Sequence, residues 1–428
     1  MPQPRNSLLA ALIGLRGNAR AATYTEPMWG MSMMLVLPYA SVYMLALGLG
    51  DEQVGFLATV SMLSQMVFGL LGGVITDKYG RRRTTAVWDL VAWSVPCLVW
   101  AFAQNFWFFL VASVINGAWQ VTQNSWDCLL VEDAEPSQLT TIYSLIRVAG
   151  DLSALFMPIA ALLVSQVGLE PAVRILYLNA FVIMTIKVFI LYRYSTETST
   201  GRMRMEQTRD RSLWSLLREY RGVLHLALRS KGTVYSLAIM AIVAAVQLVN
   251  GTFWQVIASR KLLVPDPLLP LFPMLRSALS IVFFFTVIPR LTRAHNLKLP
   301  TLLSFGIYLI GQVTLAAIPA PEGAADWSTY LLLAVSLAFD GFGAAILGML
   351  AESLVALLVD RDERSRVMAL QRTFVMLVTA PFGWIGGWLS GMDRTLPFVL
   401  TAALLVLGLA VTARFHVSAH PDPQPLAA

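Results

Sequence analysis

The stretch GGVITDKYGRRR, residues 72–83, decides the fold of this chain. It places one carboxylate and four cations between two long apolar segments, 54–76 and 84–104. Each segment is about as long as a membrane span, and only a few polar residues separate them, so the stretch predicts a short hairpin at a membrane surface. We therefore expect the chain on both sides of it to form membrane helices.

The composition agrees with an integral membrane protein. Of the 428 residues, 57% are hydrophobic and 13% are charged, and the mean hydropathy is +0.66, whereas roughly a quarter of residues are charged in soluble domains. The apolar windows are too long for barrel strands and lack their period-two alternation. The sequence thus predicts an all-α membrane protein. Cys97 and Cys128 lie inside apolar windows and indicate neither a disulfide nor a metal site.

Twelve apolar windows are separated by charged residues, glycine or proline. The first six are 28–48, 54–76, 84–104, 106–130, 140–166 and 172–192, and the second six are 233–257, 268–289, 300–318, 328–358, 367–390 and 396–413. One long polar stretch lies between the two sets. The expected organisation is a tail at 1–27, a first six-helix half at 28–192, a linker at 193–232, a second six-helix half at 233–413 and a tail at 414–428.

The distribution of Lys and Arg sets the expected orientation. If the N-terminus is cytoplasmic, the loops and tails on that side hold 23 of the 31 Lys and Arg residues, the opposite loops hold three, and five lie in spans. By the positive-inside rule both termini are then cytoplasmic, in a multi-pass protein of the plasma (inner) membrane. Residues 1–22 lack the core of a signal peptide.

The linker and the two halves each carry a weaker pattern. Apolar residues at helical spacing between Leu213 and Leu228 favour either an amphipathic helix on the membrane surface or an ordinary solvated helix. The fourth window ends in LLVE at 129–132 and the tenth in LLVD at 357–360. Together with the six-plus-six layout, this match favours two structural repeats with a cavity between them.

Gly73-x-x-x-Asp77-x-x-Gly80-Arg81-Arg82, between the second and third windows, resembles the G-x-x-x-D-x-x-G-R-[RK] signature of the major facilitator superfamily. The resemblance covers the layout of the whole chain, but the motif is present only in the first half. It implies two six-helix halves that transport a small molecule by alternating access. It also implies that Asp77 and Arg81 latch the halves together on the cytoplasmic side, with an acidic residue at the end of the fourth span. The candidates for that residue are Asp127, Glu132 and Asp133.

The glycines and charges of this stretch also have physical roles that do not depend on the resemblance. Gly69 and Gly73 lie four residues apart and leave one helix face free for the close approach of a neighbouring helix. Gly80 allows a tight reversal, and Asp77 can pair with Arg81 or with the N-terminus of an opposing helix. Alternatively, the arginines at 81–83 only anchor the topology. This is the favoured interpretation for Arg82 and Arg83.

Two other patterns of the family are missing. Many proton-driven members carry an arginine in the fourth span within R-x-x-Q-G, where this chain has SVING at 113–117. The Gly-Pro-Gly-Gly cluster that is frequent in the fifth span of drug exporters is also absent, and its closest match, Pro381 to Gly387, lies in the eleventh span. These departures argue against drug/proton antiport.

Charges inside spans mark candidate ion sites, because each costs at least ~2.5 kcal/mol at mid-bilayer unless it faces a cavity or a partner. Asp151 and Asp340 are the deepest carboxylates and the candidates for a proton or cation site. Asp151 is four residues from Arg147, so a structural ion pair is an equal alternative. Arg276 either binds an anionic group of the substrate or pairs with Asp340. The four histidines lie outside the spans, so any proton coupling has to use carboxylates.

Polar and aromatic side chains form stripes on the fourth and seventh spans. The fourth carries Asn116, Trp119, Gln120 and Gln123, and the seventh carries Gln247, Asn250 and Trp254. Amides beside indole faces suit a hydroxyl-rich or amphipathic ligand, so these residues, with Arg276, are the candidate substrate lining. The alternative is hydrogen bonding between helices, which is common in membrane bundles.

No sequence motif favours a different chemistry. G-x-x-x-x-G-K-[ST], H-E-x-x-H and paired C-x-x-C are absent, so we expect no enzyme, no metal and no cofactor. The cations form no basic face, which argues against a nucleic-acid partner. The expected partners are a small-molecule substrate and the lipid bilayer, with protons as the hypothesised coupling ion at Asp151 or Asp340. An uncoupled facilitator of a sugar-like or amphipathic solute is one alternative, and a non-transporting sensor or scaffold with the same fold is another.

Overall fold

The computed structural model describes residues 8–135, 138–213, 231–286, 298–358 and 364–414, and within these ranges the chain is helical, with short turns and no strand. The predicted all-α class is therefore confirmed. Two predicted features, the amphipathic helix between Leu213 and Leu228 and the tail after Arg414, lie outside the described residues.

The first half contains eleven helices in its described part, and α12 follows them in the linker. Their bounds are α1 (Leu8–Gly14), α2 (Gly17–Val36), α3 (Ala40–Ala46), α4 (Asp51–Tyr79), α5 (Arg81–Asp89), α6 (Val95–Ala101), α7 (Phe106–Asn116), α8 (Trp119–Val131), α9 (Leu139–Ser153), α10 (Met157–Val167), α11 (Leu169–Tyr194) and α12 (Ser199–Thr208). Short 3-10 or π-helical turns join α2 to α3, α5 to α6 and α9 to α10. Pro38, Pro96 and Pro158 lie in or beside these turns, where a missing backbone N–H is tolerated.

The second half repeats this layout with longer helices. The described ones are α15 (Lys231–Arg260), α16 (Leu271–Thr286), α18 (Lys298–Ala317), α19 (Trp327–Leu358), α20 (Arg364–Thr379), α21 (Pro381–Met392) and α22 (Leu396–Arg414). Helices α20 and α21 follow each other with Ala380 between them and act as one span.

Ten helical segments in the described part of the chain are long and apolar enough to cross a membrane. The other two predicted spans are α7 with α8, which break at Gly117, and α16, of which 16 residues are described. The glycine at the break has a packing reason, because a Cβ on Gly117 would lie 2.6 Å from the Cβ of Ser64 on α4. With these two segments, the described helices make the twelve passes that the sequence predicted.

The first span begins earlier than predicted. Helix α2 starts at Gly17, and α1 precedes it, so much of the expected tail at 1–27 is helical. The first predicted window starts only after Glu26 and Pro27, which are not apolar membrane residues. In the structure, however, Pro27 lies within α2 and Asn18 is buried. Polar side chains that face the interior of a bundle lower the hydropathy without ending the helix, which explains the error.

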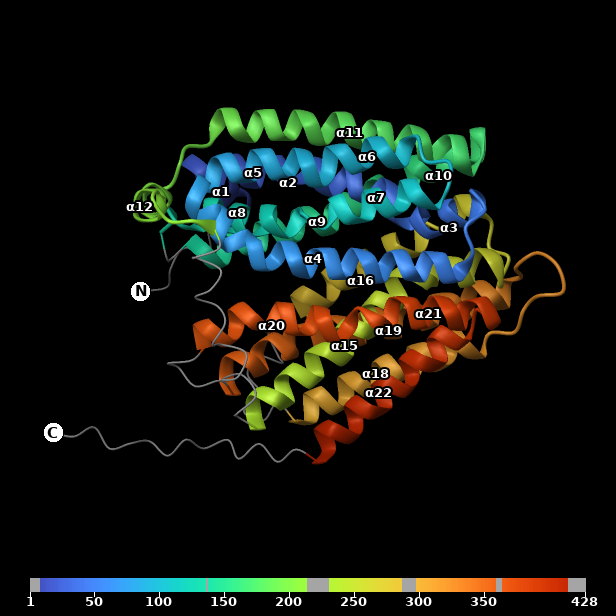
Figure 1. The fold of residues 1–428 in the computed structure, drawn as a ribbon. Coiled ribbons are helices and arrows are strands. Elements are labelled where there is room, and N and C mark those ends of the chain that lie inside the picture. Colours follow the sequence, from blue (N-terminus) through green and yellow to red (C-terminus); the bar gives the residue numbers. More distant parts are fainter. Residues whose placement is uncertain (1–7, 136–137, 214–230, 287–297, 359–363, 415–428) are drawn as a thin grey trace.

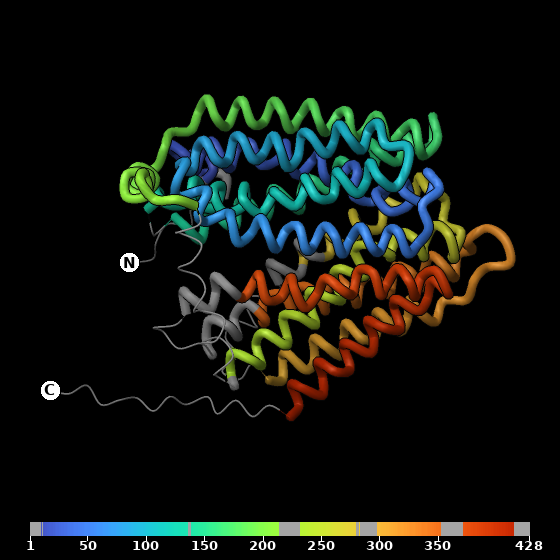
Figure 2. The backbone as a smooth tube through the Cα atoms, in the orientation of Figure 1, coloured from blue at the N-terminus to red at the C-terminus, as the bar shows by residue number. Residues whose placement is uncertain are grey.

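The two halves form two bundles that lie side by side. Figure 1 shows α2 to α11 above and α15 to α22 below, and the tube in Figure 2 shows the same separation. We call the end with the turn at Gly80 the Gly80 end, and the opposite end, where α4 begins, the Asp51 end. The bundles meet at the Asp51 end, where α4 packs along α21, and diverge toward the Gly80 end (Figures 1 and 2).

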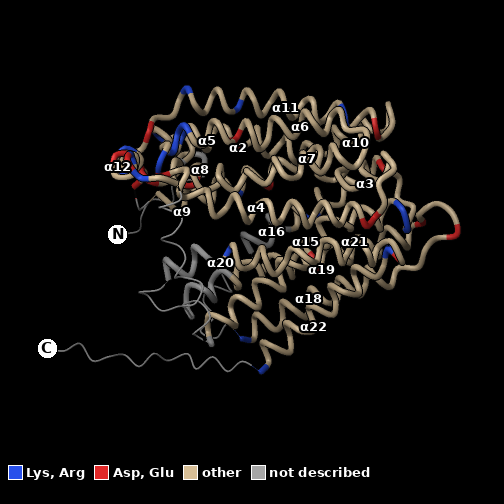
Figure 3. The backbone as a smooth tube through the Cα atoms, in the orientation of Figure 1, with Lys and Arg blue, Asp and Glu red and all other residues tan. Residues whose placement is uncertain are grey.

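Charged residues gather at the two ends of the molecule, and the middle of the bundles is largely uncharged (Figure 3). This is the distribution that a spanning bundle requires, since charged side chains are stable in water and costly in hydrocarbon. The few charges at mid-depth therefore identify positions to examine for function.

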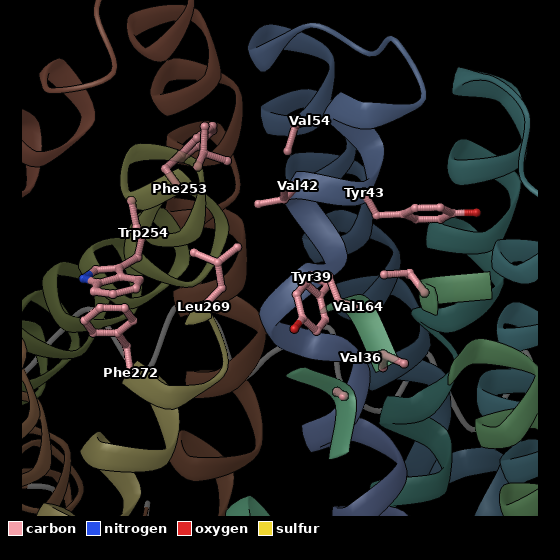
Figure 4. Packing of buried hydrophobic residues seen from close by; sticks show 14 of the residues in the cluster. Val36, Tyr39, Val42, Tyr43, Val54, Val164, Phe253, Trp254, Leu269 and Phe272 are labelled. Atoms are coloured by element: carbon pink, nitrogen blue, oxygen red, sulfur yellow. The ribbon is translucent and has the colours of Figure 1, made fainter. Parts of the chain in front are cut away.

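One hydrophobic core joins the halves near the Asp51 end. Tyr39 and Val42 of the first half belong to the same buried cluster as Phe253, Trp254 and Leu269 of the second, and Figure 4 shows these groups approaching from opposite sides. Burial of apolar surface is the dominant favourable term in such packing, so this shared core holds the Asp51 end together.

Candidate functional site

A buried arginine organises the Gly80 end. Arg81 is 4% exposed; its Nη1 atom lies 3.0 Å from Asp77 and its Nη2 atom 3.0 Å from Glu132. Its Nε atom also donates to both carboxylate oxygens of Glu132 at 3.1 Å. Of the three acidic candidates, the structure thus brings Glu132 to Arg81. Asp127 instead accepts from Gln123, and Asp133 bonds elsewhere.

The reversal at Gly80 is completed by the linker. Gly80 has a φ of +85°, which L side chains rarely adopt. The carboxylate of Glu197, just after α11, accepts from the backbone N–H groups of Arg81 at 2.9 Å and Arg82 at 3.1 Å, so it caps the start of α5. Thr208 at the end of α12 donates to the carbonyl of Asp77 at 3.2 Å. Sequence reasoning missed Glu197, since no spacing rule links it to Gly80.

The close approach on α4 lies one residue from the predicted position. A Cβ on Gly72 would lie 3.3 Å from the backbone of Gln120 and Val121 on α8, whereas one on Gly69 would have its nearest neighbour at 3.9 Å. The contact face therefore runs through Gly69 and Gly72, and Gly73 is half-buried beside it. A separation of three residues keeps side chains on one face as well as four does.

A cavity of about 420 Å³ lies between the halves. It is lined by residues of α4 and α8 on one side and by residues of α15 and α20 on the other. Three of the predicted substrate-lining residues, Trp119, Gln120 and Gln123, are in its wall, and Arg372 faces them from the second half. We call it the interhalf cavity.

A second cavity of about 420 Å³ lies inside the first half. Four indoles, those of Trp29, Trp93, Trp119 and Trp126, line it, and we call it the tryptophan cavity. Its other lining residues are Glu26, Asp89, Thr122, Gln123 and Lys187. Within it, Lys187 Nζ lies 2.8 Å from Asp89 Oδ2, and both side chains are almost fully buried.

Sequence reasoning did not single out the charges of the tryptophan cavity. Asp89 and Lys187 are opposite charges in the predicted third and sixth windows, and such a pair is a usable signal because an unpaired charge there would be costly. Glu26 was assigned to the tail because the first window was taken to begin after it. These residues meet because α11 packs against both α2 and α5.

Three of the remaining predicted lining residues, Asn116, Asn250 and Trp254, make structural contacts. Asn116 donates to the carbonyl of Ala92 at 2.8 Å, and Asn250 donates to the hydroxyl of Tyr308 at 3.0 Å. The ring of Trp254 packs on Phe272 with centroids 5.2 Å apart (Figure 4). Hydrogen bonding between helices, the alternative reading, therefore describes the two asparagines. Gln247 is exposed and lies in the wall of neither cavity.

The two candidate coupling carboxylates have different surroundings. Asp151 lies 3.1 Å from Nε of Arg147, which is the predicted ion pair. Asp340 is 3% exposed and accepts from Nε2 of Gln312 at 2.8 and 2.9 Å. Arg276 packs on Gly341 and lies within electrostatic reach of Asp340, but no ion pair joins the two within the described residues. Asp340 is thus the more deeply buried carboxylate.

Direct contacts close the Asp51 end across the two halves. Nη2 of Arg394 lies 3.2 Å from Asp51, and the hydroxyl of Thr59 donates to the carbonyl of Ala380 at 2.6 Å. The backbones also approach closely, because a Cβ on Gly387 would lie 2.8 Å from the carbonyl oxygen of Asp51. The interhalf cavity is therefore sealed at this end by polar and backbone contacts.

Two curated relatives match short stretches of the chain. The multi-drug resistance efflux pump PmrA of Streptococcus pneumoniae is 30% identical over 109 residues, which are 24% of this chain and 27% of that protein. The quinolone resistance protein NorA of Staphylococcus aureus is 34% identical over 83 residues, which are 19% of this chain and 21% of that protein. The chain thus matches about a quarter of the length of these relatives.

Solved transporter structures and a family model match most of the chain. The nucleoside transporter NupG has a TM-score of 0.72 at 15% identity, over 94% of this chain and 100% of that one. The peptide transporter POT has a TM-score of 0.67 at 15% identity, over 95% and 97%. At such identities the likeness concerns the fold alone. The model of the Major Facilitator Superfamily matches residues 28–328, a range that holds Gly73 to Arg83 and the polar stripes of the fourth and seventh spans. Because this range is more than half of the chain, the protein belongs to the major facilitator superfamily.

Proposed function

We propose that this protein is a proton-driven secondary transporter of the plasma membrane that exports an amphipathic small molecule by alternating access. The observation that carries the proposal is the interhalf cavity, which both halves line and which contacts at the Asp51 end seal. A site between two halves that meet at one end and diverge at the other is the arrangement that alternating access requires.

The Gly80 end faces the cytoplasm in this proposal, because the positive-inside rule places the basic loops there. The arrangement described above is then the inward-facing state. In that state Asp77, Arg81 and Glu132 bond within the first half. Their proposed role as a latch belongs to the opposite state, in which the halves meet at the Gly80 end and the second half can reach this cluster.

The direction of transport and the kind of substrate rest on the relatives and on the cavity walls. The two relatives are named as an efflux pump and a drug resistance protein, which supports export of organic molecules. Trp119 offers an indole face, and Gln120 and Gln123 offer amides, which suits an amphipathic ligand. Since the arginine of many proton-driven members is missing from the fourth span, coupling has to use other residues.

Asp340 is the proposed coupling carboxylate. It is buried, it has no ion-pair partner among the described residues, and one amide group of Gln312 donates to both of its oxygens. Arg276 lies within electrostatic reach of Asp340 but makes no ion pair with it, so protonation of Asp340 removes a buried charge and breaks no ion pair. Asp151 is held by Arg147 and would lose that pair on protonation.

Flux in liposomes tests the proposal. The purified chain would be reconstituted into liposomes with an acidic interior, and uptake of ethidium would be measured with and without a protonophore. Ethidium is permanently charged, so a pH gradient cannot trap it without a carrier. We expect accumulation that the protonophore abolishes and that protein-free liposomes lack. Equilibration without accumulation would establish an uncoupled facilitator, and absence of ethidium flux would favour the sensor or scaffold.

A further inference from the structure

We propose that the tryptophan cavity is a binding site for an organic cation with a single positive charge and an aromatic or otherwise apolar body. The assignment deepens the proposed function by naming a substrate class. It rests on that function only for the claim that the bound cation is transported, because binding can be measured without flux.

The charges of the cavity leave one negative charge without compensation. Lys187 and Asp89 neutralise each other at 2.8 Å. Glu26, half-buried in the same wall, makes no hydrogen bond or ion pair with any described residue. Lys187, which is paired with Asp89, also lies within electrostatic reach of Glu26, so two carboxylates share one ammonium and the group carries one excess negative charge. Asp127 lies within electrostatic reach of Glu26 as well, and Arg372 lies within reach of Asp127 and offsets it. An unpaired carboxylate at membrane depth is costly, so a ligand that brings one positive charge stabilises the site.

The depth of the site strengthens this requirement. Asp89 is the last of the nine residues of α5, roughly 12 Å along the helix from the Gly80 end. Glu26 is the tenth residue of α2, which starts at the same end. Both carboxylates therefore lie well inside the bundle, where water screens charges poorly.

The aromatic walls suit a cation as well. The rings of Trp29 and Trp93 meet edge to face with centroids 5.5 Å apart, and those of Trp93 and Trp119 are 6.4 Å apart. Indole is the best of the aromatic side chains at attracting a cation over its face. Indoles that are packed only to fill space would need no carboxylate beside them, so the combination of both groups favours a cationic ligand.

Three buried polar atoms in the wall of the tryptophan cavity also lack a hydrogen-bond partner among the described residues. Asp89 Oδ1, Thr122 Oγ1 and Trp126 Nε1 are each buried without a hydrogen-bond partner in the described part of the chain, and all three residues line the cavity. Buried polar groups are nearly always hydrogen-bonded. A set of unpaired acceptors and a donor around one cavity therefore indicates recognition of a ligand that carries polar groups of its own.

The cavity is connected to the transport path by shared residues. Trp119 and Gln123 line both the tryptophan cavity and the interhalf cavity. The two cavities therefore adjoin, with these side chains between them. The volume of about 420 Å³ is in the range of cavities that hold drug-sized molecules.

Anions are the class that this site disfavours. Its one cation, Lys187, is already paired with Asp89, so an anion would face an unpaired Glu26 and gain no free positive charge. A zwitterion would leave its own negative group without a partner. A preference for positively charged ligands therefore distinguishes a cation site from an apolar pocket that binds ligands of any charge.

Binding to the purified chain in detergent tests the assignment. Equilibrium dialysis would compare tetraphenylphosphonium with tetraphenylborate, which has the same shape and the opposite charge. Glu26→Gln removes the unpaired charge, and Glu322→Gln makes the same chemical change on an exposed loop residue outside the cavity. We expect saturable binding of one tetraphenylphosphonium per chain, weakened about tenfold by Glu26→Gln and unchanged by Glu322→Gln, with no saturable binding of tetraphenylborate.

Equal affinity of folded Glu26→Gln and the wild type for tetraphenylphosphonium would overturn the assignment, as would preferential binding of tetraphenylborate. If Glu26→Gln does not fold, Trp93→Leu replaces it, and an unchanged affinity of that variant would equally overturn the assignment. Failure of this proposal is distinguishable from failure of the proposed function. Flux that does not depend on Glu26 keeps the transporter and removes the site, whereas Glu26-dependent binding without flux keeps the site and removes the transporter.

Discussion

Nη2 of Arg394 lies 3.2 Å from Oδ2 of Asp51, and this ion pair joins the second half to the first at the Asp51 end. The side chain of Asp51 is 11% exposed and that of Arg394 is 34% exposed, so the pair is only partly screened by water. It has a counterpart that does not cross between halves, because Lys261 and Asp393 pair at 3.0 Å within the second half at the same end.

Loss of the crossing pair should favour the outward-facing state. We expect Asp51→Asn to weaken the closed Asp51 end by about 0.2–1 kcal/mol, which shifts the ratio of the two states up to about fivefold. Spin labels on the Asp51 ends of α4 and α21 would report the longer distance. Asp393→Asn is the control, since it breaks a pair inside one half. An equal shift in both variants would show that the crossing pair has no special role.

The glycine contact at the same end should be intolerant of a methyl group. A Cβ at position 387 would lie 2.8 Å from the carbonyl oxygen of Asp51 and 2.9 Å from Cα of Gly55, whereas a Cβ on Gly391 meets no atom within 4 Å. We expect Gly387→Ala to cost about 1–3 kcal/mol through overpacking and to lower the melting temperature in detergent. Gly391→Ala, on the same helix α21, should not lower it. Similar melting temperatures for the two variants would contradict the close approach.

The cluster around Arg81 predicts a difference between two neighbouring acids. Glu132 accepts from both Nε and Nη2 of Arg81, whereas Asp133 is exposed and accepts from Ser199. We expect Glu132→Gln to cost about 1–3 kcal/mol, because it weakens charged hydrogen bonds to a buried guanidinium, and Asp133→Asn to cost less than about 1 kcal/mol. Thermal unfolding in detergent measures both. A larger loss in Asp133→Asn would mean that Glu132 is not the third member of the cluster.

The two candidate coupling residues should separate in a transport assay. We expect Asp340→Asn to abolish accumulation driven by a proton gradient while exchange of substrate across the liposome membrane continues. Asp151→Asn should keep the accumulation and lose only the stability that its pair with Arg147 gives, about 0.2–0.5 kcal/mol. Full gradient-driven accumulation by Asp340→Asn would remove Asp340 from the mechanism.

Local patterns predicted local structure well. The twelve passes followed from the lengths of apolar windows, since a span depends on composition over about 20 residues. The pair of Asp77 with Arg81 and that of Arg147 with Asp151 followed from spacing, because residues four apart share a helix face. Such inferences need no knowledge of which helices are neighbours.

Contacts between distant segments were the part that sequence could not supply. Glu26 and Lys187 approach each other only because α2 and α11 pack together. The amide stripes failed in part for the same reason: Gln120 and Gln123 line a cavity, whereas Asn116 and Asn250 bond to neighbouring helices. A stripe marks one face of a helix but does not reveal whether a cavity or another helix lies opposite. The start of α2 was misplaced because its polar residues face inward.

The most direct test of alternating access is a reversible cross-link at the Asp51 end. Nε1 of Trp384 on α21 donates to Glu52 on α4 at 3.1 Å, and both residues are exposed. Glu52→Cys and Trp384→Cys would be combined in a chain whose native Cys97 and Cys128 are replaced by Ala, and joined by a bifunctional thiosulfonate in liposomes. We predict that the cross-link abolishes transport, that reduction restores it, and that neither single cysteine variant responds. Transport at the full rate by the cross-linked protein would contradict alternating access between the two halves.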